Sequence, residues 1–96
     1  MTNRDIFQEP VQLLKALAHP VRMCIVVNLM KECRNVNQMK ECLEIPQSTV
    51  SQQLAVLKTQ GIVAGERRGN EVCYSLIDEK TKKIVKLLLG EFQIEL

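Results

Sequence analysis

The sequence predicts a mainly α-helical protein that carries one small β-hairpin. Several segments repeat apolar residues at the spacing of one helix face, as Val50, Leu54 and Leu57 do. One run, 72–77, instead alternates in the manner of a strand, and the Gly69-Asn70 pair before it is typical of a hairpin turn. A chain of 96 residues is long enough for a single domain with one modest hydrophobic core.

Two helices are expected in the first third of the chain. The first covers 3–18, and Pro10 within it either bends the helix or marks its true start after a short first turn. Pro20 is well placed in the first turn of a second helix, which runs to about Glu32. This second helix is apolar on most sides, so we expect it to be the central core helix.

The middle of the chain predicts a helix-turn-helix. Asn35 and Asn37 both offer N-caps for a short helix over about 36–43. A connection of about three residues, ending at Pro46, then leads to a helix over 47–60. Two helices joined by so short a turn, the second with a polar outer face, are typical of this motif.

The outer face of the helix over 47–60 is polar but uncharged. A solvated helix face would more often carry pairs of Glu and Lys. Short hydroxyl and amide groups both donate and accept hydrogen bonds, which suits contact with base edges in a major groove. Opposite the stripe of Val50, Leu54 and Leu57, this face carries Ser48, Gln52, Ala55 and Thr59.

The last third of the chain predicts a wing and a final helix. Gly61 ends the preceding helix, and a hairpin over 64–77 follows with Arg67 and Arg68 near its tip. Asp78 then caps a helix over 79–92. The complete layout, αααα-ββ-α, is that of a winged helix-turn-helix, formed as one domain over 1–96.

The final helix carries more large apolar side chains than one small core requires. A surplus of this kind favours a symmetric dimer. We expect the dimer interface to contain Phe7, Leu87, Leu88, Leu89 and Phe92.

Composition and charge exclude several function classes. Three aromatic residues are too few for a binder of single-stranded nucleic acid that stacks on bases. The net charge of +2 is weak, but residues 58–86 hold seven Lys/Arg against four Asp/Glu, so positive charge follows the polar helix. One histidine and no glycine-rich phosphate loop argue against an enzyme. With no apolar run of about 18 residues and no signal-peptide pattern, we expect a cytoplasmic protein.

The four cysteines show neither a CxxC motif nor paired zinc spacing, so we expect free thiols. Cys24 and Cys42 fall on helix faces predicted to point inward, and Cys33 is expected to be the most exposed and reactive. A thiol-based sensor that uses Cys24, Cys33 and Cys42 remains an alternative. Cys73 lies in the alternating run.

Two motifs resemble the ArsR/SmtB family of bacterial repressors. Ala16-Leu17-Ala18-His19-Pro20-Val21-Arg22 is similar to the segment that opens this family's apolar helix, and Pro46 to Leu54 is similar to its recognition-helix signature. The likeness extends over about residues 13–77. It implies a homodimeric winged-helix repressor that binds a palindromic operator and leaves it when an inducer is sensed. Gln53 stands where many members have His, and it keeps a donor and an acceptor there.

The family's sensing sites do not carry over to this chain. Asn35-Val36-Asn37 stands where arsenic and cadmium sensors have Cys-Val-Cys, and the only histidine, His19, lies far from the last helix, where zinc sensors bind metal. Val27 and Gln93 stand where the persulfide-sensing branch has cysteines. The resemblance is therefore nearest to the metal-blind branch that includes virulence regulators, and it implies no metal and no cofactor.

Double-stranded DNA is the expected partner, contacted by polar and basic side chains of the helix over 47–60 and of the hairpin. A winged helix used only for contacts between proteins is the alternative of another class. The candidate DNA contacts are Gln47, Ser48, Thr49, Ser51, Gln52, Gln53, Lys58, Arg67, Arg68 and Asn70.

Overall fold

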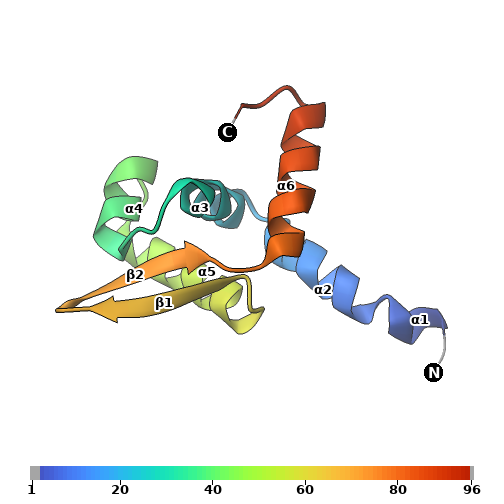
Figure 1. The fold of residues 1–96 in the computed structure, drawn as a ribbon, viewed down its shortest axis with the longest axis horizontal. Helices are drawn as coiled ribbons and strands as arrows, with labels where there is room; N and C mark the ends of the chain where they lie inside the picture. Colours follow the sequence, from blue (N-terminus) through green and yellow to red (C-terminus); the bar gives the residue numbers. More distant parts are fainter. Residues whose placement is uncertain (1–2, 96) are drawn as a thin grey trace.

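Helices and one two-stranded antiparallel sheet make up the part of the chain that the computed structural model describes, residues 3–95. Figure 1 shows that α3, α4, α5 and the hairpin form the body of the molecule, from which α2 and α6 project. In chain order the elements are α1 (Asn3–Ile6), α2 (Gln8–Leu17), α3 (Pro20–Lys31), α4 (Val36–Leu43), α5 (Gln47–Thr59), β1 (Val63–Arg68), β2 (Glu71–Leu76) and α6 (Glu79–Glu91).

The expected first helix is divided in two. It breaks at Phe7, and Pro10 is the third residue of α2. Proline has no backbone N–H to donate, and the first turn of a helix does not require one. The possibility of a short turn before the true helix start is therefore confirmed, and the described chain has one short helix more than the predicted αααα-ββ-α.

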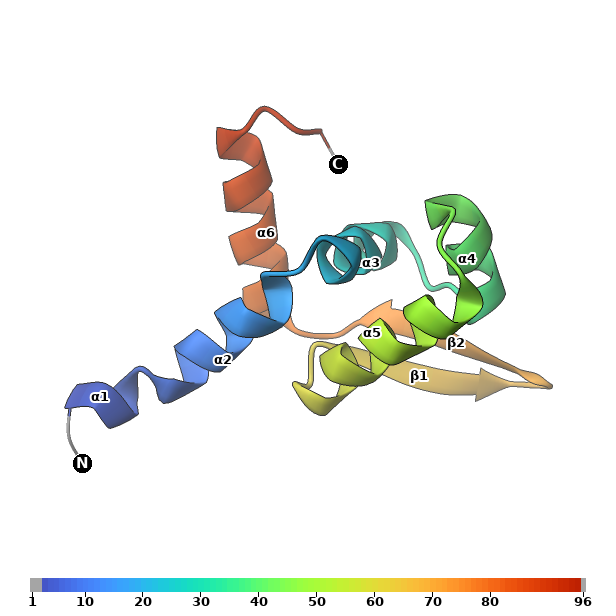
Figure 2. The ribbon, with the colours of Figure 1, turned by 180° about the vertical axis from the view of Figure 1, so that it is seen from behind.

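Helix α3 is the central core helix, as expected. His19 caps it by accepting a hydrogen bond on Nδ1 from the Val21 N–H at 3.1 Å, and Pro20 occupies the first helical position. In the views from both sides, α3 lies between α6 and α4 (Figures 1 and 2). The buried core consists of Ala16, Leu17, Ile25, Val26, Leu29, Met39, Val50, Leu54, Leu57, Ile62, Val63, Leu76, Val85 and Leu89.

Helices α4 and α5 form the predicted helix-turn-helix. Of the two candidate caps, Asn35 begins α4: it accepts a hydrogen bond from the Gln38 N–H at 2.7 Å, and Gln38 Oε1 accepts one from the Asn35 N–H at 2.9 Å. Glu44 then takes up a left-handed conformation with a φ of 55°, which ends α4. Only Ile45 and Pro46 separate this residue from α5.

The hairpin pairs with a third segment of the chain. β1 and β2 are antiparallel and join at Gly69, whose φ of 64° suits a tight turn. Arg34, in the link between α3 and α4, forms a bridge to Tyr74: the Arg34 N–H donates to the Tyr74 carbonyl at 3.0 Å, and the Tyr74 N–H donates to the Arg34 carbonyl at 2.8 Å. The wing is thereby held against the segment that leads into α4.

Helix α6 begins as predicted at an Asp78 cap. The Asp78 carboxylate accepts hydrogen bonds from the Thr81 N–H at 3.1 Å and the Thr81 hydroxyl at 2.7 Å. Burial alone would raise the pKa of Asp78, but the hydrogen bonds from Thr81 and the nearby Lys80 ammonium hold that pKa below its usual value. The carboxylate therefore stabilises the start of α6 at neutral pH, and this contribution is lost as the pH falls through the lowered pKa.

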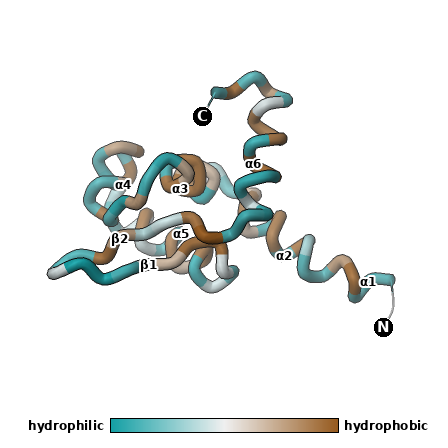
Figure 3. Tube along the Cα trace, viewed as in Figure 1, coloured by the Kyte–Doolittle hydropathy of each residue, from teal (hydrophilic) through white to brown (hydrophobic). Residues whose placement is uncertain are grey.

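Both projecting helices carry apolar segments outside the body (Figure 3). Within residues 3–95 no single helix is long and apolar enough to cross a membrane; only α2 and α3 taken together, with a 90° bend between them, have that length and composition.

Candidate nucleic-acid interface

Helix α5 has one fully buried face and one exposed polar face. Val50, Leu54 and Leu57 are buried in the core, as the apolar stripe predicts. On the opposite side the side chains of Gln47, Ser48, Ser51 and Gln52 are exposed, whereas Thr49 is half-buried on the flank. The buried stripe therefore fixes the rotation of α5 about its axis, and the hydroxyl and amide side chains face outward.

Gln53 is half-buried and is already engaged within the protein. Its Oε1 accepts a hydrogen bond from Arg22 Nη1 at 2.9 Å. The same guanidinium donates from Nε to the Ala16 carbonyl at 2.6 Å and from Nη2 to the Lys15 carbonyl at 3.1 Å. Arg22 thus ties α5 to the C-terminal end of α2. The amide oxygen of Gln53 is occupied by this contact, which helps to position α5. Sequence reasoning missed Arg22, which carried no signal beyond its place in the family motif.

The two ends of α5 present groups of positive character. Pro46 is the N-cap residue and has no side-chain acceptor, so it leaves the first-turn N–H groups available to a phosphate. Lys58 is exposed in the last turn. Gly61 follows with a φ of 73°, and its N–H donates to the Lys58 carbonyl at 3.0 Å, which ends the helix as predicted.

The two arginines of the wing lie on opposite faces of the hairpin. Arg67 is paired with Val72 and Arg68 with Glu71, and successive residues of a strand point to opposite sides. Arg68 Nη2 lies 3.8 Å from Glu66 Oε2, and both side chains are largely exposed. An ion pair so long and so exposed is weak, so Arg68 remains free to exchange Glu66 for a phosphate.

The wing also requires one small residue. A Cβ atom on Gly65 would lie 2.7 Å from Val72 Cγ1 and 2.9 Å from Tyr74 Cε1. The Val72 and Tyr74 side chains therefore cover Gly65 across the hairpin. Asn70, in the turn of the hairpin, is exposed.

The candidate dimer residues differ in exposure. Phe7, Leu88, Leu87 and Phe92 are exposed, to 58%, 42%, 70% and 70% respectively. Leu89 is 8% exposed and belongs to the core of its own chain. The exposed residues continue on α2 with Val11 and Leu14, so the apolar surface spans α2 and α6.

The prediction of four free thiols is wrong, because two of the four cysteines form a disulfide. Cys33 and Cys73 are joined by a disulfide, and the free thiols are Cys24 and Cys42. The side chains of Cys24 and Cys42 are exposed, so their predicted inward orientation is wrong; Cys33, predicted to be the most exposed, is half-buried. Cys24 lies one residue before the fully buried Ile25, which takes the inward direction of α3. Among residues 3–95, no three His, Cys, Asp or Glu residues are grouped so that they could hold a metal ion.

The chain is similar in sequence to bacterial transcriptional regulators. Residues 19–64 match the family described as bacterial regulatory protein, arsR family. The HTH-type transcriptional repressor SmtB of Mycobacterium tuberculosis is 45% identical over 82 residues, which are 85% of this chain and 61% of that relative. This chain thus spans less than two thirds of the length of SmtB.

Solved structures share the fold. The transcriptional repressor BigR from Xylella fastidiosa superposes with a TM-score of 0.84 at 36% identity, over 96% of this chain and 97% of BigR. The homodimeric winged helix-turn-helix DNA-binding domain of Mb0332 from Mycobacterium bovis superposes with a TM-score of 0.84 over 97% and 88% of the two chains. Its identity is 23%, so this likeness concerns the fold alone.

Proposed function

The chain belongs to the ArsR family of bacterial regulatory proteins, and we propose that it is a homodimeric transcriptional repressor that binds duplex DNA through α5 and the wing. The observation that carries this proposal is the exposed outer face of α5. That face carries the hydroxyl and amide groups of Ser48, Ser51 and Gln52 on a helix whose rotation is fixed by three buried residues. Such a surface fits the donors and acceptors of a major groove. A repressor of this kind works beside the chromosome, in the cytoplasm, and needs neither a catalytic residue nor a cofactor.

A symmetric dimer would present two copies of α5 to the DNA. Recognition helices of dimeric helix-turn-helix proteins enter successive major grooves about 34–36 Å apart. The operator is then an imperfect palindrome whose symmetry matches that of the dimer.

We assign recognition of the DNA bases and contact with the DNA phosphates to different side chains. Ser48 and Gln52 are exposed on the outer face of α5, where they reach base edges, and glutamine pairs with adenine N6 and N7. Arg67, Arg68 and Asn70 are exposed at the end of the hairpin. They contact phosphates, which raises affinity for every sequence alike. Lys58 makes a further contact with the DNA phosphate backbone.

Substitution of Gln52 and Arg67 should separate these two roles. Gln52→Ala should remove roughly 1–3 kcal/mol of discrimination between operator variants and leave the salt dependence of binding nearly unchanged. Arg67→Ala should weaken binding to all duplexes about equally and lower the log–log salt slope by about 0.9 for each phosphate that the variant no longer neutralises. Binding isotherms at several salt concentrations, on a duplex enriched from a random pool and on its mutated forms, measure both effects.

Gln60→Ala is the matched control, because Gln60 is exposed beyond the last turn of α5 and lies outside the proposed contacts. It should alter neither the preference nor the slope. If Arg67→Ala changed which operator is preferred while Gln52→Ala did not, the assigned roles would be reversed. If the protein bound no duplex DNA, the alternative function would replace this proposal: a winged helix used only for contacts with other proteins.

A further inference from the structure

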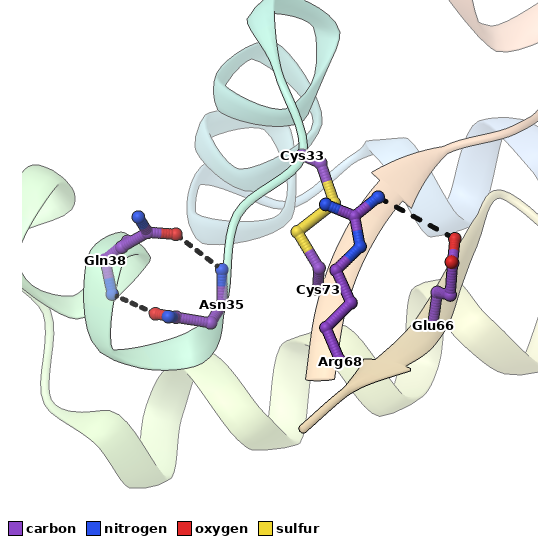
Figure 4. The surroundings of a disulfide bond; sticks show 6 residues. All are labelled: Cys33, Asn35, Gln38, Glu66, Arg68 and Cys73. Carbon is purple, nitrogen blue, oxygen red and sulfur yellow. Dashed lines mark hydrogen bonds and ion pairs between the residues drawn. A yellow bond between two sulfur atoms is a disulfide. The ribbon is translucent and has the colours of Figure 1, made fainter. Parts of the chain in front are cut away.

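The disulfide joins two parts of the chain that border the DNA-binding elements. Cys33 lies in the link between α3 and α4, and Cys73 lies in β2. Their Cα atoms are 5.8 Å apart, although 40 positions separate them in the sequence. Figure 4 shows the bond bridging the α3–α4 link and the wing, beside the hydrogen bonds between Asn35 and Gln38 that cap α4.

The loop closed by this bond contains α5 and the wing up to the middle of β2. Residues 33–73 include α4, α5, β1 and the hairpin turn. All ten candidate DNA contacts fall between Gln47 and Asn70. The bond therefore fixes the wing relative to the start of the helix-turn-helix.

The backbone keeps the two cysteines close without the help of the bond. Each cysteine immediately precedes one partner of the Arg34–Tyr74 bridge, whose two backbone hydrogen bonds measure 3.0 and 2.8 Å. In the reduced protein this bridge still holds the two thiols as neighbours. Both residues are half-buried, so neither belongs to the buried core of the domain. The pair can therefore open and close without unfolding of the domain.

We propose that Cys33 and Cys73 form a reversible redox switch that sets the affinity of the protein for DNA. This inference rests on the proposed function, because it concerns the same wing and the same α5. The compartment of a DNA-binding repressor keeps most thiols reduced, and a disulfide found there is usually catalytic or redox-sensing. A pair held in register at the edge of the DNA-binding unit meets the structural requirements of such a sensor.

The oxidant is a low-molecular-weight disulfide. One protein thiolate attacks a sulfur of this molecule, and the first small thiolate leaves as a mixed disulfide forms. The second protein thiolate then attacks the protein sulfur of the mixed disulfide and releases the second small thiolate. The two protons of Cys33 and Cys73 end on the two released thiols, so the protein loses two electrons and the small disulfide gains them.

Oxidation should strengthen DNA binding. The Arg34–Tyr74 bridge is present in both forms, and the closed bond adds a covalent restraint beside it, so less conformational freedom of the wing is lost when it meets the phosphates. Arg68 lies on the same face of the hairpin as Cys73, since Cys73 pairs with Glu66 and Arg68 is two residues further along β1 (Figure 4). We expect the oxidised protein to bind its duplex about five- to tenfold more tightly than the reduced protein.

The test measures binding of one duplex, enriched from a random pool by the protein itself, to both redox forms. The protein is equilibrated with reduced or with oxidised glutathione, a linear small disulfide, and mass spectrometry of peptides checks for the Cys33–Cys73 linkage. The Cys24→Ser/Cys42→Ser variant, which lacks only the free thiols, should keep the difference in affinity. The Cys33→Ser/Cys73→Ser variant should bind equally under both conditions, with an affinity near that of the reduced wild type.

The outcomes distinguish this inference from the function on which it rests. Equal affinity of both forms of the wild type, failure of the linkage to form in oxidised glutathione, or a redox response that disappears in Cys24→Ser/Cys42→Ser would overturn the switch and leave the repressor proposal standing. The wild-type comparison and the peptide analysis remain decisive if the Cys33→Ser/Cys73→Ser variant does not fold. Binding to no duplex in either form would overturn the proposed function and the switch with it.

Discussion

Replacing Leu88 with glutamate should convert the proposed dimer into monomers, with a dimer dissociation constant raised at least about a hundredfold. Leu88 lies where α6 meets α2, and together with Leu14, Leu17 and Met23 it lines an apolar hollow of about 200 Å³. In a symmetric dimer across α2 and α6 each interface would contain two copies of the new carboxylate. Each would be buried without a partner, which is among the most costly changes an interface can suffer.

Exposure supports Leu88 as the site of this test. Its side chain is 42% exposed in the single chain, so glutamate there keeps access to water in a monomer. Leu89 would be a poor choice, because it is buried in its own core and its substitution would destabilise the monomer as well.

Sedimentation equilibrium measures the effect on the association state. Lys86→Glu is the matched control: Lys86 is exposed on the side of the same helix opposite Leu88, and its substitution introduces the same carboxylate. The control should remain dimeric, and both variants should show the helical circular dichroism of the wild type. A wild-type chain that is monomeric at micromolar concentration, or a Leu88→Glu variant that associates as the wild type does, would contradict the proposed interface.

Reduction of the Cys33–Cys73 bond should lower the free energy of unfolding by about 4 kcal/mol, the entropy of closing a loop of this length in the unfolded chain. The bond spans 40 positions. It restricts the unfolded chain far more than the folded one, in which the Arg34–Tyr74 bridge already holds the two segments together. The loss is a large share of the stability of a small domain.

Urea unfolding of the oxidised and reduced wild type measures this difference. The Cys24→Ser/Cys42→Ser variant should show the same loss on reduction, because its disulfide is intact. Cys33→Ser should unfold at the same urea concentration with and without reductant. Equal unfolding midpoints for the oxidised and reduced wild type would show that the bond restricts the unfolded chain little.

Local patterns predicted most of the fold. The stripe of Val50, Leu54 and Leu57 fixed the buried face of α5, and the resemblance to the ArsR/SmtB family is confirmed by the match over residues 19–64. Asn35, Gly61 and Asp78 marked helix ends correctly, because capping depends on residues within one turn of each other. The candidate DNA contacts on α5 follow from the same periodicity, and those on the wing follow from the hairpin signal and its basic residues; all of them stay predictions until DNA binding is measured.

Contacts between distant segments were beyond such patterns. Cys33 and Cys73 are brought together by the bridge between Arg34 and Tyr74, and no spacing in the sequence signals that pairing. The hydrogen bond from Arg22 to Gln53 likewise joins residues 31 positions apart. Periodicity assigned Cys24 to the core, but Ile25 and Val26 fill the inward positions of α3 and leave the thiol exposed.

Selection of duplexes from a random pool by the oxidised wild-type protein tests the central claim most directly. If two copies of α5 read successive major grooves, repeated rounds should enrich an imperfect palindrome with half-site centres about 10–10.5 base pairs apart, or a multiple of that spacing. Selection with Gln52→Ala should return the same spacing with a relaxed base preference at one position in each half-site. A pool that stays random after repeated rounds with the wild type would contradict sequence-specific recognition by α5.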